Sequence, residues 1–199
     1  MINEPRTAQI HRVTGETDVF VSIGLDGTGK YEISTGIGFF DHMLSAFARH
    51  GFFDLTVKVK GDLEVDTHHT IEDTGIVLGQ AIARALGDKK GIHRYGSCAL
   101  PMDETFVLCG LDLCGRAYYS SDVKYTVERI GDFETEMADE FFLAVANQAA
   151  MNLHLKELSG VNNHHIMEAS FKAFGRALDM AVSYDPRIHD VLSTKGSLA

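Results

Sequence analysis

The stretches that decide the fold are residues 66–87, DTHHTIEDTGIVLGQAIARALG, and residues 162–183, NNHHIMEASFKAFGRALDMAVS. Each contains two adjacent histidines followed at the same spacing by a glutamate, as HHTIE and HHIME. Each also begins with side chains that can cap a helix and continues with apolar residues at helical spacing, and a glycine or a proline follows its end. A repeated helix with matched polar residues predicts that the chain consists of two similar halves.

Other stretches repeat in the same order. Glu16-Thr17 followed by Val21–Asp26 corresponds to Glu104-Thr105 followed by Val107–Asp112, and each is interpreted as a strand that ends in a Gly-Leu-Asp turn. Shorter helices are predicted over 36–51 and 134–151, each followed by an alternating, strand-like segment. The expected fold class is α+β, with helices packed on sheets, built from repeats at about 6–90 and 91–186.

Composition excludes several classes of protein. The chain has 18 Lys+Arg against 28 Asp+Glu, a formal net charge of -10, which argues against a nucleic-acid partner. A small phosphorylated ligand needs only two or three well-placed cations and stays possible. No apolar run is long enough to cross a membrane, and the first residues lack the pattern of a secretion signal. We therefore expect a cytoplasmic protein without a membrane partner.

The repeated motif predicts a metal site. On a helix, the histidines and the glutamate of each motif are three or four residues apart and can reach one side of the first turn. Imidazole and carboxylate ligands together suit Mn, Fe, Zn or Co. Aligning DHMLSAF with DEFFLAV adds one further candidate on each shorter helix. The predicted ligands, enough for two metals, are His42, His68, His69, Glu72, Glu140, His164, His165 and Glu168. The alternative is that paired histidines are capping or surface residues.

Taken together, these motifs resemble the imidazoleglycerol-phosphate dehydratase family over about residues 6–196. The matching stretches are LDGTG (25–29), FFDHML (39–44), HHTIED (68–73), HHIMEASFKAFGRAL (164–178) and STKG (193–196). Four positions depart from the family pattern. Glu140 stands where many members have a histidine, Thr67 replaces an aspartate, and Ser45-Ala46 replaces Asp-Gln.

The resemblance implies a single dehydratase domain over residues 1–199, with a duplicated ribosomal protein S5 domain 2-like fold and left-handed β-α-β units. It implies two Mn²⁺ per active site and a homo-oligomer of twenty-four subunits with active sites at subunit interfaces. The implied reaction converts D-erythro-imidazole-glycerol phosphate to imidazole-acetol phosphate in histidine biosynthesis. The implied path runs through a metal-bound imidazolate and a diazafulvene-like intermediate.

The resemblance also implies roles for individual residues. Glu16 and Glu168 are expected to be the acid/base carboxylates, unless Glu168 is purely a metal ligand and Glu16 or a metal-bound water is the base. The residues expected to contact the substrate, several of them in a C-terminal tail, are Glu16, His42, Arg94, Arg116, Lys172, Ser193, Thr194 and Lys195. Two other classes remain open, a dinuclear phosphoester hydrolase and a non-catalytic cage held together by metals.

Overall fold

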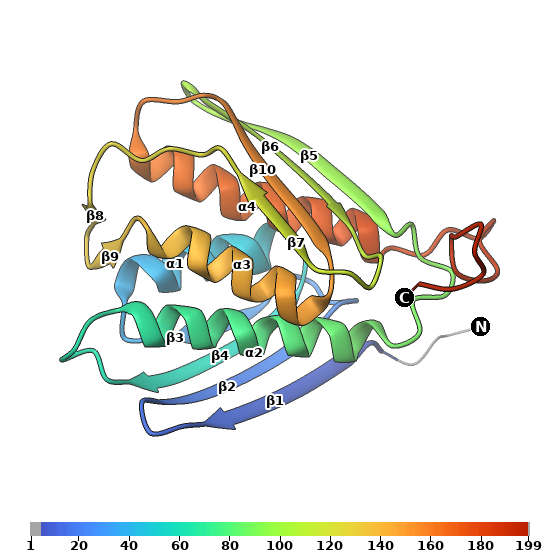
Figure 1. The fold of residues 1–199 in the computed structure, drawn as a ribbon, viewed down its shortest axis with the longest axis horizontal. Coiled ribbons are helices and arrows are strands. Elements are labelled where there is room, and N and C mark those ends of the chain that lie inside the picture. Colours follow the sequence, from blue (N-terminus) through green and yellow to red (C-terminus); the bar gives the residue numbers. More distant parts are fainter. Residues whose placement is uncertain (1–4, 199) are drawn as a thin grey trace.

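Four helices lie between two four-stranded sheets in the computed structural model, which describes residues 5–198 (Figure 1). The first half contains β1 (Thr7–Val13), β2 (Thr17–Gly24), β3 (Tyr31–Ser34), α1 (Gly38–His50), β4 (Asp54–Gly61) and α2 (His68–Leu86). The second half contains β5 (Tyr95–Met102), β6 (Thr105–Asp112), β7 (Tyr118–Ser121), β8 (Arg129–Ile130), β9 (Phe133–Glu134), α3 (Met137–Ala149), β10 (Asn152–Ser159) and α4 (Asn163–Val182).

The two sheets have the same topology. Their strand orders are β1-β2-β4-β3 and β5-β6-β10-β7, with antiparallel pairs except for the parallel pairs β3–β4 and β7–β10. In each half the short helix lies in the connection between the two parallel strands. The long helix is the last element of the half. The duplicated α+β fold predicted from the repeated motifs is thereby confirmed.

Each sheet buries one face against the helices. In β2, for example, Val19, Val21 and Ile23 are at most 1% exposed, whereas Asp18 between the strand's buried positions is open to solvent. Alternation of this kind is what a sheet with one wet face requires. Burial of the apolar faces against α1–α4 supplies the single hydrophobic core that holds both halves together.

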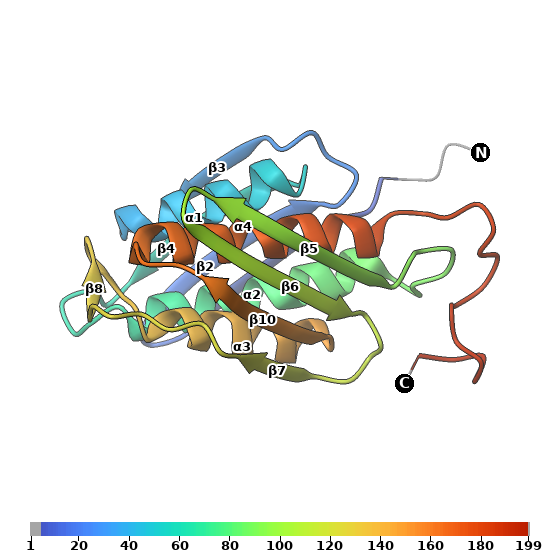
Figure 2. The ribbon, with the colours of Figure 1, turned by 90° about the horizontal axis from the view of Figure 1, so that it is seen from above.

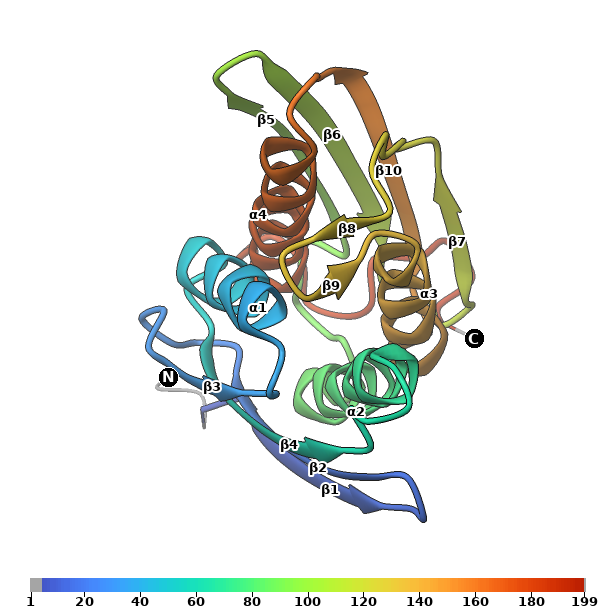
Figure 3. The ribbon, with the colours of Figure 1, turned by 90° about the vertical axis from the view of Figure 1, so that its left-hand side faces the viewer.

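The helices pack in two pairs, α1 on α4 and α2 on α3, as the end-on view shows (Figure 3). Glycines set how closely the helices approach. A Cβ placed on Gly175 of α4 would lie 2.6 Å from the carbonyl oxygen of Phe47 on α1. A Cβ on Gly79 of α2 would lie 2.7 Å from the carbonyl oxygen of Val145 on α3. Side chains near these crossings are therefore brought close to the partner helix.

The second Gly-Leu-Asp stretch corrects the sequence-based prediction. Gly24 ends β2, and Leu25 and Asp26 follow it, but Asp112 is still inside β6. Backbone hydrogen bonds pair the Leu25 N–H with the Arg6 carbonyl and the Leu113 N–H with the Arg94 carbonyl. Structural equivalence therefore joins Leu25 to Leu113, two residues beyond the leucine that the matching letters suggest. The alignment by matching letters and the structural alignment differ by two residues, so the same side chains of the strand face inward in both. The alternation of buried and exposed positions therefore could not distinguish them.

The hairpin of β8 and β9 connects the second half to the first. Within it, the Asp132 carboxylate accepts hydrogen bonds from the backbone N–H groups of Gly38 and Phe39, at 2.8 and 3.2 Å, at the start of α1. Glu134 accepts a 2.6 Å hydrogen bond from the hydroxyl of Thr67 at the start of α2. The hairpin thus accepts hydrogen bonds from backbone N–H groups in the first turn of α1. It also contacts the residue that precedes α2.

A tail follows α4 and extends past the end of the sandwich, as the view from above shows (Figure 2). Among residues 5–198, no helix combines the length and the hydrophobicity that a membrane crossing would need.

Asp54 fixes the turn in the LDGTG stretch. Its carboxylate accepts hydrogen bonds from the backbone N–H groups of Thr28 and Lys30, at 2.8 and 3.0 Å. The hydrogen bond from Thr28 is the main reason that the pKa of Asp54 lies below its usual value of 3.8. Gly27 packs so closely that a Cβ there would lie 2.4 Å from the Asp54 nitrogen. The turn therefore depends on an ionised Asp54.

We predict that Asp54→Ala lowers the free energy of unfolding by about 1–2 kcal/mol at pH 7, because two charge-assisted hydrogen bonds are lost. Since the folded-state pKa is depressed, this contribution is present above the unfolded pKa of 3.8 and is lost as pH falls through the folded value. Urea unfolding of both proteins at pH 7 and pH 3 tests this, with Glu64→Ala as an exposed control. An equal deficit at both pH values would contradict it.

Candidate functional site

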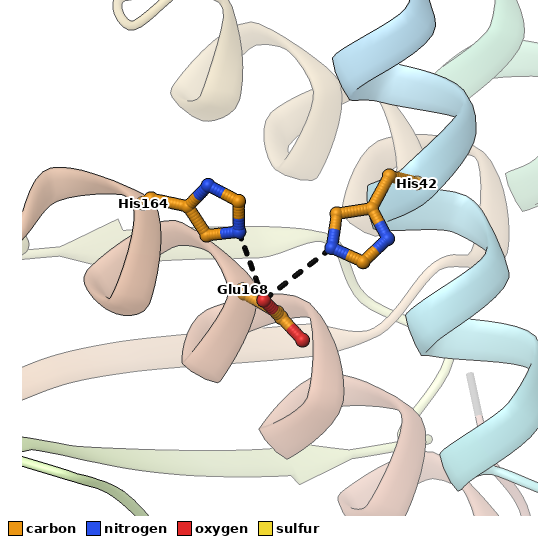
Figure 4. A group of neighbouring side chains, drawn as sticks. All are labelled: His42, His164 and Glu168. Carbon is orange, nitrogen blue, oxygen red and sulfur yellow. Dashed lines mark hydrogen bonds and ion pairs between the residues drawn. The ribbon is translucent and has the colours of Figure 1, made fainter.

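Three predicted ligands meet between α1 and α4. His42 extends from α1, His164 and Glu168 extend from the first turns of α4, and one ligand atom from each lies within 4.8 Å of the others (Figure 4). Glu168 Oε2 is 3.4 Å from His42 Nε2 and 3.1 Å from His164 Nε2. We call this set the α1–α4 ligand group.

Local structure explains why these side chains converge. The Asn162 side chain caps α4 by accepting hydrogen bonds from the backbone N–H groups of His164 and His165. The helix thus begins where the sequence predicts, and His164 and Glu168, four residues apart, lie on one face. The close crossing at Gly175 then brings α1, and with it His42, onto that face.

Glu168 is a buried anion. Its residue is 8% exposed, and Lys172 Nζ donates to Glu168 Oε1 at 2.6 Å. Burial by itself would raise the pKa of Glu168, but the hydrogen bond and charge of Lys172, together with His42 and His164, outweigh burial and hold the pKa below its usual value. Glu168 therefore remains ionised at neutral pH, with Oε2 directed at the two imidazoles. Lys172, predicted to contact the substrate, lies against Glu168.

A second group occupies the equivalent place between α2 and α3. Glu72 and Glu140 line one cavity of about 150 Å³, and His68 Nε2 is 3.7 Å from Glu72 Oε2. Glu140 on α3 corresponds to His42 on α1, as the alignment of the two short helices predicts. We call His68, Glu72 and Glu140 the α2–α3 ligand group.

The second histidine of each motif is directed elsewhere. The rings of His68 and His69 are inclined at 80°, and those of His164 and His165 at 83°. His69 Nδ1 lies 2.9 Å from Asp62, and its Nε2 lies 3.7 Å from Glu16. The expectation that all three side chains of a motif share one side therefore holds only for the first histidine and the glutamate. Asp62 raises the pKa of His69 by its hydrogen bond.

The ring of His165 is also held at Nδ1 by a carboxylate, from a residue that the sequence analysis did not include among the candidate site residues. Its Nδ1 lies 2.9 Å from Glu104, the residue that corresponds to Glu16. The hydrogen bond to His165 is the largest reason that the pKa of Glu104 lies far below its usual value. Hydrogen bonding at Nδ1 fixes a histidine ring and leaves Nε2 free to bind a metal. The repeated Glu-Thr pair was the only sequence signal for this role.

Five of the residues predicted to contact the substrate gather at the opposite end of the molecule from Lys172. A cleft of about 850 Å³ is lined by Arg94, Arg116 and the tail residues 193–195. The Arg94 backbone N–H donates to the carbonyl of Ala181 in the last turn of α4, whereas Glu168 lies near its start. These 13 residues of helix span about 20 Å. Within one chain, the cleft and the α1–α4 ligand group are therefore far apart, near opposite ends of α4. Figures 1 and 2 show the C-terminal tail leaving the far end of this helix.

The donor set fits a divalent transition metal. Two imidazole nitrogens and one ionised carboxylate oxygen, already within 4.8 Å of one another, leave further coordination positions open. A metal bound there would act as a Lewis acid on an oxygen or nitrogen ligand. The α1–α4 ligand group is the part of the predicted ligand set that the structure brings closest together.

Comparison with known proteins gives one consistent answer. A family model described as imidazoleglycerol-phosphate dehydratase matches residues 35–178. Imidazoleglycerol-phosphate dehydratase of Lachnoclostridium phytofermentans is 62% identical over 97% of this chain and 98% of its own, and that of Acetivibrio thermocellus is 61% identical over 97% and 99%.

Two solved structures agree. The crystal structure of imidazoleglycerol-phosphate dehydratase from Staphylococcus aureus subsp. aureus N315 matches with TM-score 0.82 and 38% identity, covering 90% of this chain and 99% of that one. The structure of IGPD from Pyrococcus furiosus in complex with (S)-C348 matches with TM-score 0.82 and 36% identity, covering 95% and 100%.

We predict that His164→Asn weakens Mn²⁺ binding about tenfold or more, because one of three converging ligands is lost. The matched control is His154→Asn, since His154 is an exposed histidine on β10 that packs on Tyr118. Titration calorimetry with Mn²⁺ compares both variants with the unmodified protein. Unchanged affinity in the His164 variant, or equal weakening in both, would remove His164 from the ligand set.

Proposed function

The chain belongs to the imidazoleglycerol-phosphate dehydratase family, and we propose on that basis that D-erythro-1-(imidazol-4-yl)glycerol 3-phosphate is its substrate and imidazole-acetol phosphate its product. The family's reaction is the dehydration step of histidine biosynthesis, carried out by a hydro-lyase. The observation that supports the proposal most strongly is the α1–α4 ligand group, in which a buried carboxylate faces two histidines.

The proposed cofactor is Mn²⁺, two per active site. Support comes from the second ligand group at the equivalent place between α2 and α3, and from His69 and His165, whose fixed rings leave Nε2 available. The eight ligands proposed are His42, His68, His69, Glu72, Glu140, His164, His165 and Glu168. When bound, the two ions supply Lewis acidity that favours the anionic form of the substrate imidazole and fixes the ring.

Dehydration is difficult because the proton to be removed has no neighbouring carbonyl to make it acidic. An electron-rich imidazole ring can expel the adjacent hydroxyl, which departs as water when a proton is delivered to its oxygen as the C–O bond breaks. The resulting diazafulvene-like form of the substrate makes the carbon-bound proton removable. A positioned carboxylate then takes it, and the enol tautomerises to the ketone.

We assign the acid/base steps to Glu16 and Glu168. Glu168 stays ionised because Lys172 and the histidines outweigh its burial, so it can accept or share a proton without first losing one. Glu16 lies in the turn before β2 with a side chain that is 55% exposed, 3.7 Å from His69 Nε2. An exposed carboxylate next to a proposed ligand can reach a substrate that lies on the metals.

The phosphate group needs cations and hydrogen-bond donors. Those proposed are Arg94, Arg116, Lys172, Ser193, Thr194 and Lys195, and all except Lys172 lie around the cleft at the tail end. One chain cannot offer both its ligand group and this cleft to the same small molecule, because about 20 Å of α4 separates them. The active site is therefore proposed to lie between subunits of a homo-oligomer with twenty-four copies.

The proposed domain organisation is one domain over residues 1–199, made of repeats at about 6–90 and 91–186 with a C-terminal substrate-binding tail. Support comes from the identical strand orders of the two sheets and from the shared core between them. A phosphorylated biosynthetic intermediate is made and used inside the cell, so the proposed location is the cytoplasm.

Removal and return of the metal tests the proposed reaction. We predict that chelation abolishes conversion of imidazole-glycerol phosphate and that Mn²⁺ restores it, because the substrate ring is activated only when the ligand groups are loaded.

Glu168→Gln should lower kcat about 1000-fold or more, since one substitution removes both a ligand and a buried anion. Formation of the enolisable ketone is measured. Release of free phosphate instead would support a phosphoester hydrolase. Absence of any turnover with Mn²⁺ would support a cage held together by metals.

Mixing two inactive variants tests the shared site. Glu168→Gln disables one end of each chain and Lys195→Ala the other, so mixed oligomers would contain some sites in which both ends are intact. We expect co-refolded mixtures to regain up to about a quarter of the unmodified activity, while each variant alone stays inactive. Refolding each variant separately and mixing afterwards is the control. No regained activity in mixed oligomers verified by mass spectrometry would place each site within one chain.

A further inference from the structure

The end of the tail, which carries Ser193, Thr194 and Lys195, follows two attachments to the body. The Asp190 carbonyl accepts a hydrogen bond from the Gly91 N–H at 3.1 Å, and the Leu192 carbonyl accepts one from Arg94. Among residues 191–198, which the structure describes, the one hydrogen bond to the rest of the fold joins Arg94 Nη1 to the Leu192 carbonyl, at 2.6 Å. The other hydrogen bonds of this segment are local, such as that from the Ser193 N–H to the Val191 carbonyl. Beyond Asp190, the placement of residues 193–195 therefore depends on the position of the Arg94 side chain.

Asp112 at the end of β6 holds that side chain. Its two carboxylate oxygens accept hydrogen bonds from Arg94 Nε and Nη2, at 2.7 and 3.0 Å. The Arg94 and Asp112 side chains are only 12% and 18% exposed, so the pair is shielded from competing water. Two-point pairing fixes the plane of a guanidinium as well as its position. The third contact, to Leu192, follows from that orientation.

These contacts do not use all the N–H groups of the Arg94 guanidinium. Arginine has five N–H donors, of which three go to Asp112 and Leu192, so one N–H on each terminal nitrogen remains. Both Arg94 and the tail residues line the cleft proposed to receive the phosphate. Orientation of Arg94 by Asp112 therefore affects two sets of phosphate contacts together.

The first half contains a matching arrangement that does not reach residues 191–198, although the Arg6 guanidinium lies 4.3 Å from the centroid of the Tyr184 ring. Arg6, structurally equivalent to Arg94, makes a two-point pair with Asp26 and donates from Nη1 to the carbonyl of Val182, at 2.6 Å. Val182 is the last residue of α4, already fixed by the helix. The same chemistry thus anchors a rigid element in one half and the substrate-binding tail in the other.

We propose that Asp112 is a positioning residue for the substrate phosphate: acting through Arg94, it sets the Leu192 carbonyl and so places residues 193–195. This inference rests on the proposed function for the phosphate role of the tail. It assigns Asp112 no contact with the substrate.

The experiment compares Asp112→Ala with Asp26→Ala in the intact, Mn²⁺-loaded protein. For Asp112→Ala we expect a rise in KM of about tenfold or more with kcat within about threefold, a similar loss of inhibition by inorganic phosphate, and about tenfold faster amide exchange over residues 191–196. For Asp26→Ala we expect wild-type values of all three. Asp112→Glu, which keeps the carboxylate, should recover part of the KM.

Melting temperatures separate positioning from general destabilisation. If Asp112→Ala does not fold, Asp112→Asn, which keeps the shape and one acceptor, takes its place. Wild-type KM and wild-type tail exchange in the folded Asp112 variant would overturn the proposal, as would equal effects in both variants. A wild-type protein without dehydratase activity would instead overturn the proposed function, and the exchange comparison, which needs no substrate, would still show whether Asp112 tethers the tail.

Discussion

The close crossing of α1 on α4 and of α2 on α3 is the constraint on which the rest of the structure depends. At Gly175 and Gly79 there is no room for a methyl group, because the opposing backbone lies closer than a side-chain carbon tolerates. Aromatic rings fill the space beside the first crossing, where Phe47 stacks on Phe174 with centroids 5.1 Å apart. The candidate ligand groups are therefore built on packed helices and not on loops, so the core fixes the backbone from which their side chains extend.

Much of this architecture could be predicted from the sequence. The repeated motif indicated the duplication, and the Asn162 cap and the helical spacing placed His164 and Glu168 on one face. The ring directions of His69 and His165 could not be predicted, because they are set by Asp62 and Glu104, which other segments supply. The role of Lys172 was equally hidden, since a lysine one turn after a glutamate can either pair with it or reach solvent.

The two ligand groups are alike in position but different in charge. The α1–α4 group has two imidazoles and one carboxylate, and Lys172 neutralises that carboxylate. At the position of Lys172, the first half has Ile76, and at the position of His42 the second half has Glu140. Compared with its counterpart, the α2–α3 group therefore has one carboxylate more, one imidazole fewer, and no lysine in the repeated position.

The β8–β9 hairpin has a consequence for the order in which the chain matures. Asp132 and Glu134 secure the beginnings of α1 and α2, yet a ribosome makes them 93 and 67 positions after their respective partners Phe39 and Thr67. While the N-terminal half emerges, the first turn of each helix has no such support and frays. His42 and His68 lie close to these turns, so the support of their helices depends in part on residues that are translated later. A nascent chain halted before residue 132 would contain both histidines but neither α3 nor α4, the helices on which α2 and α1 pack.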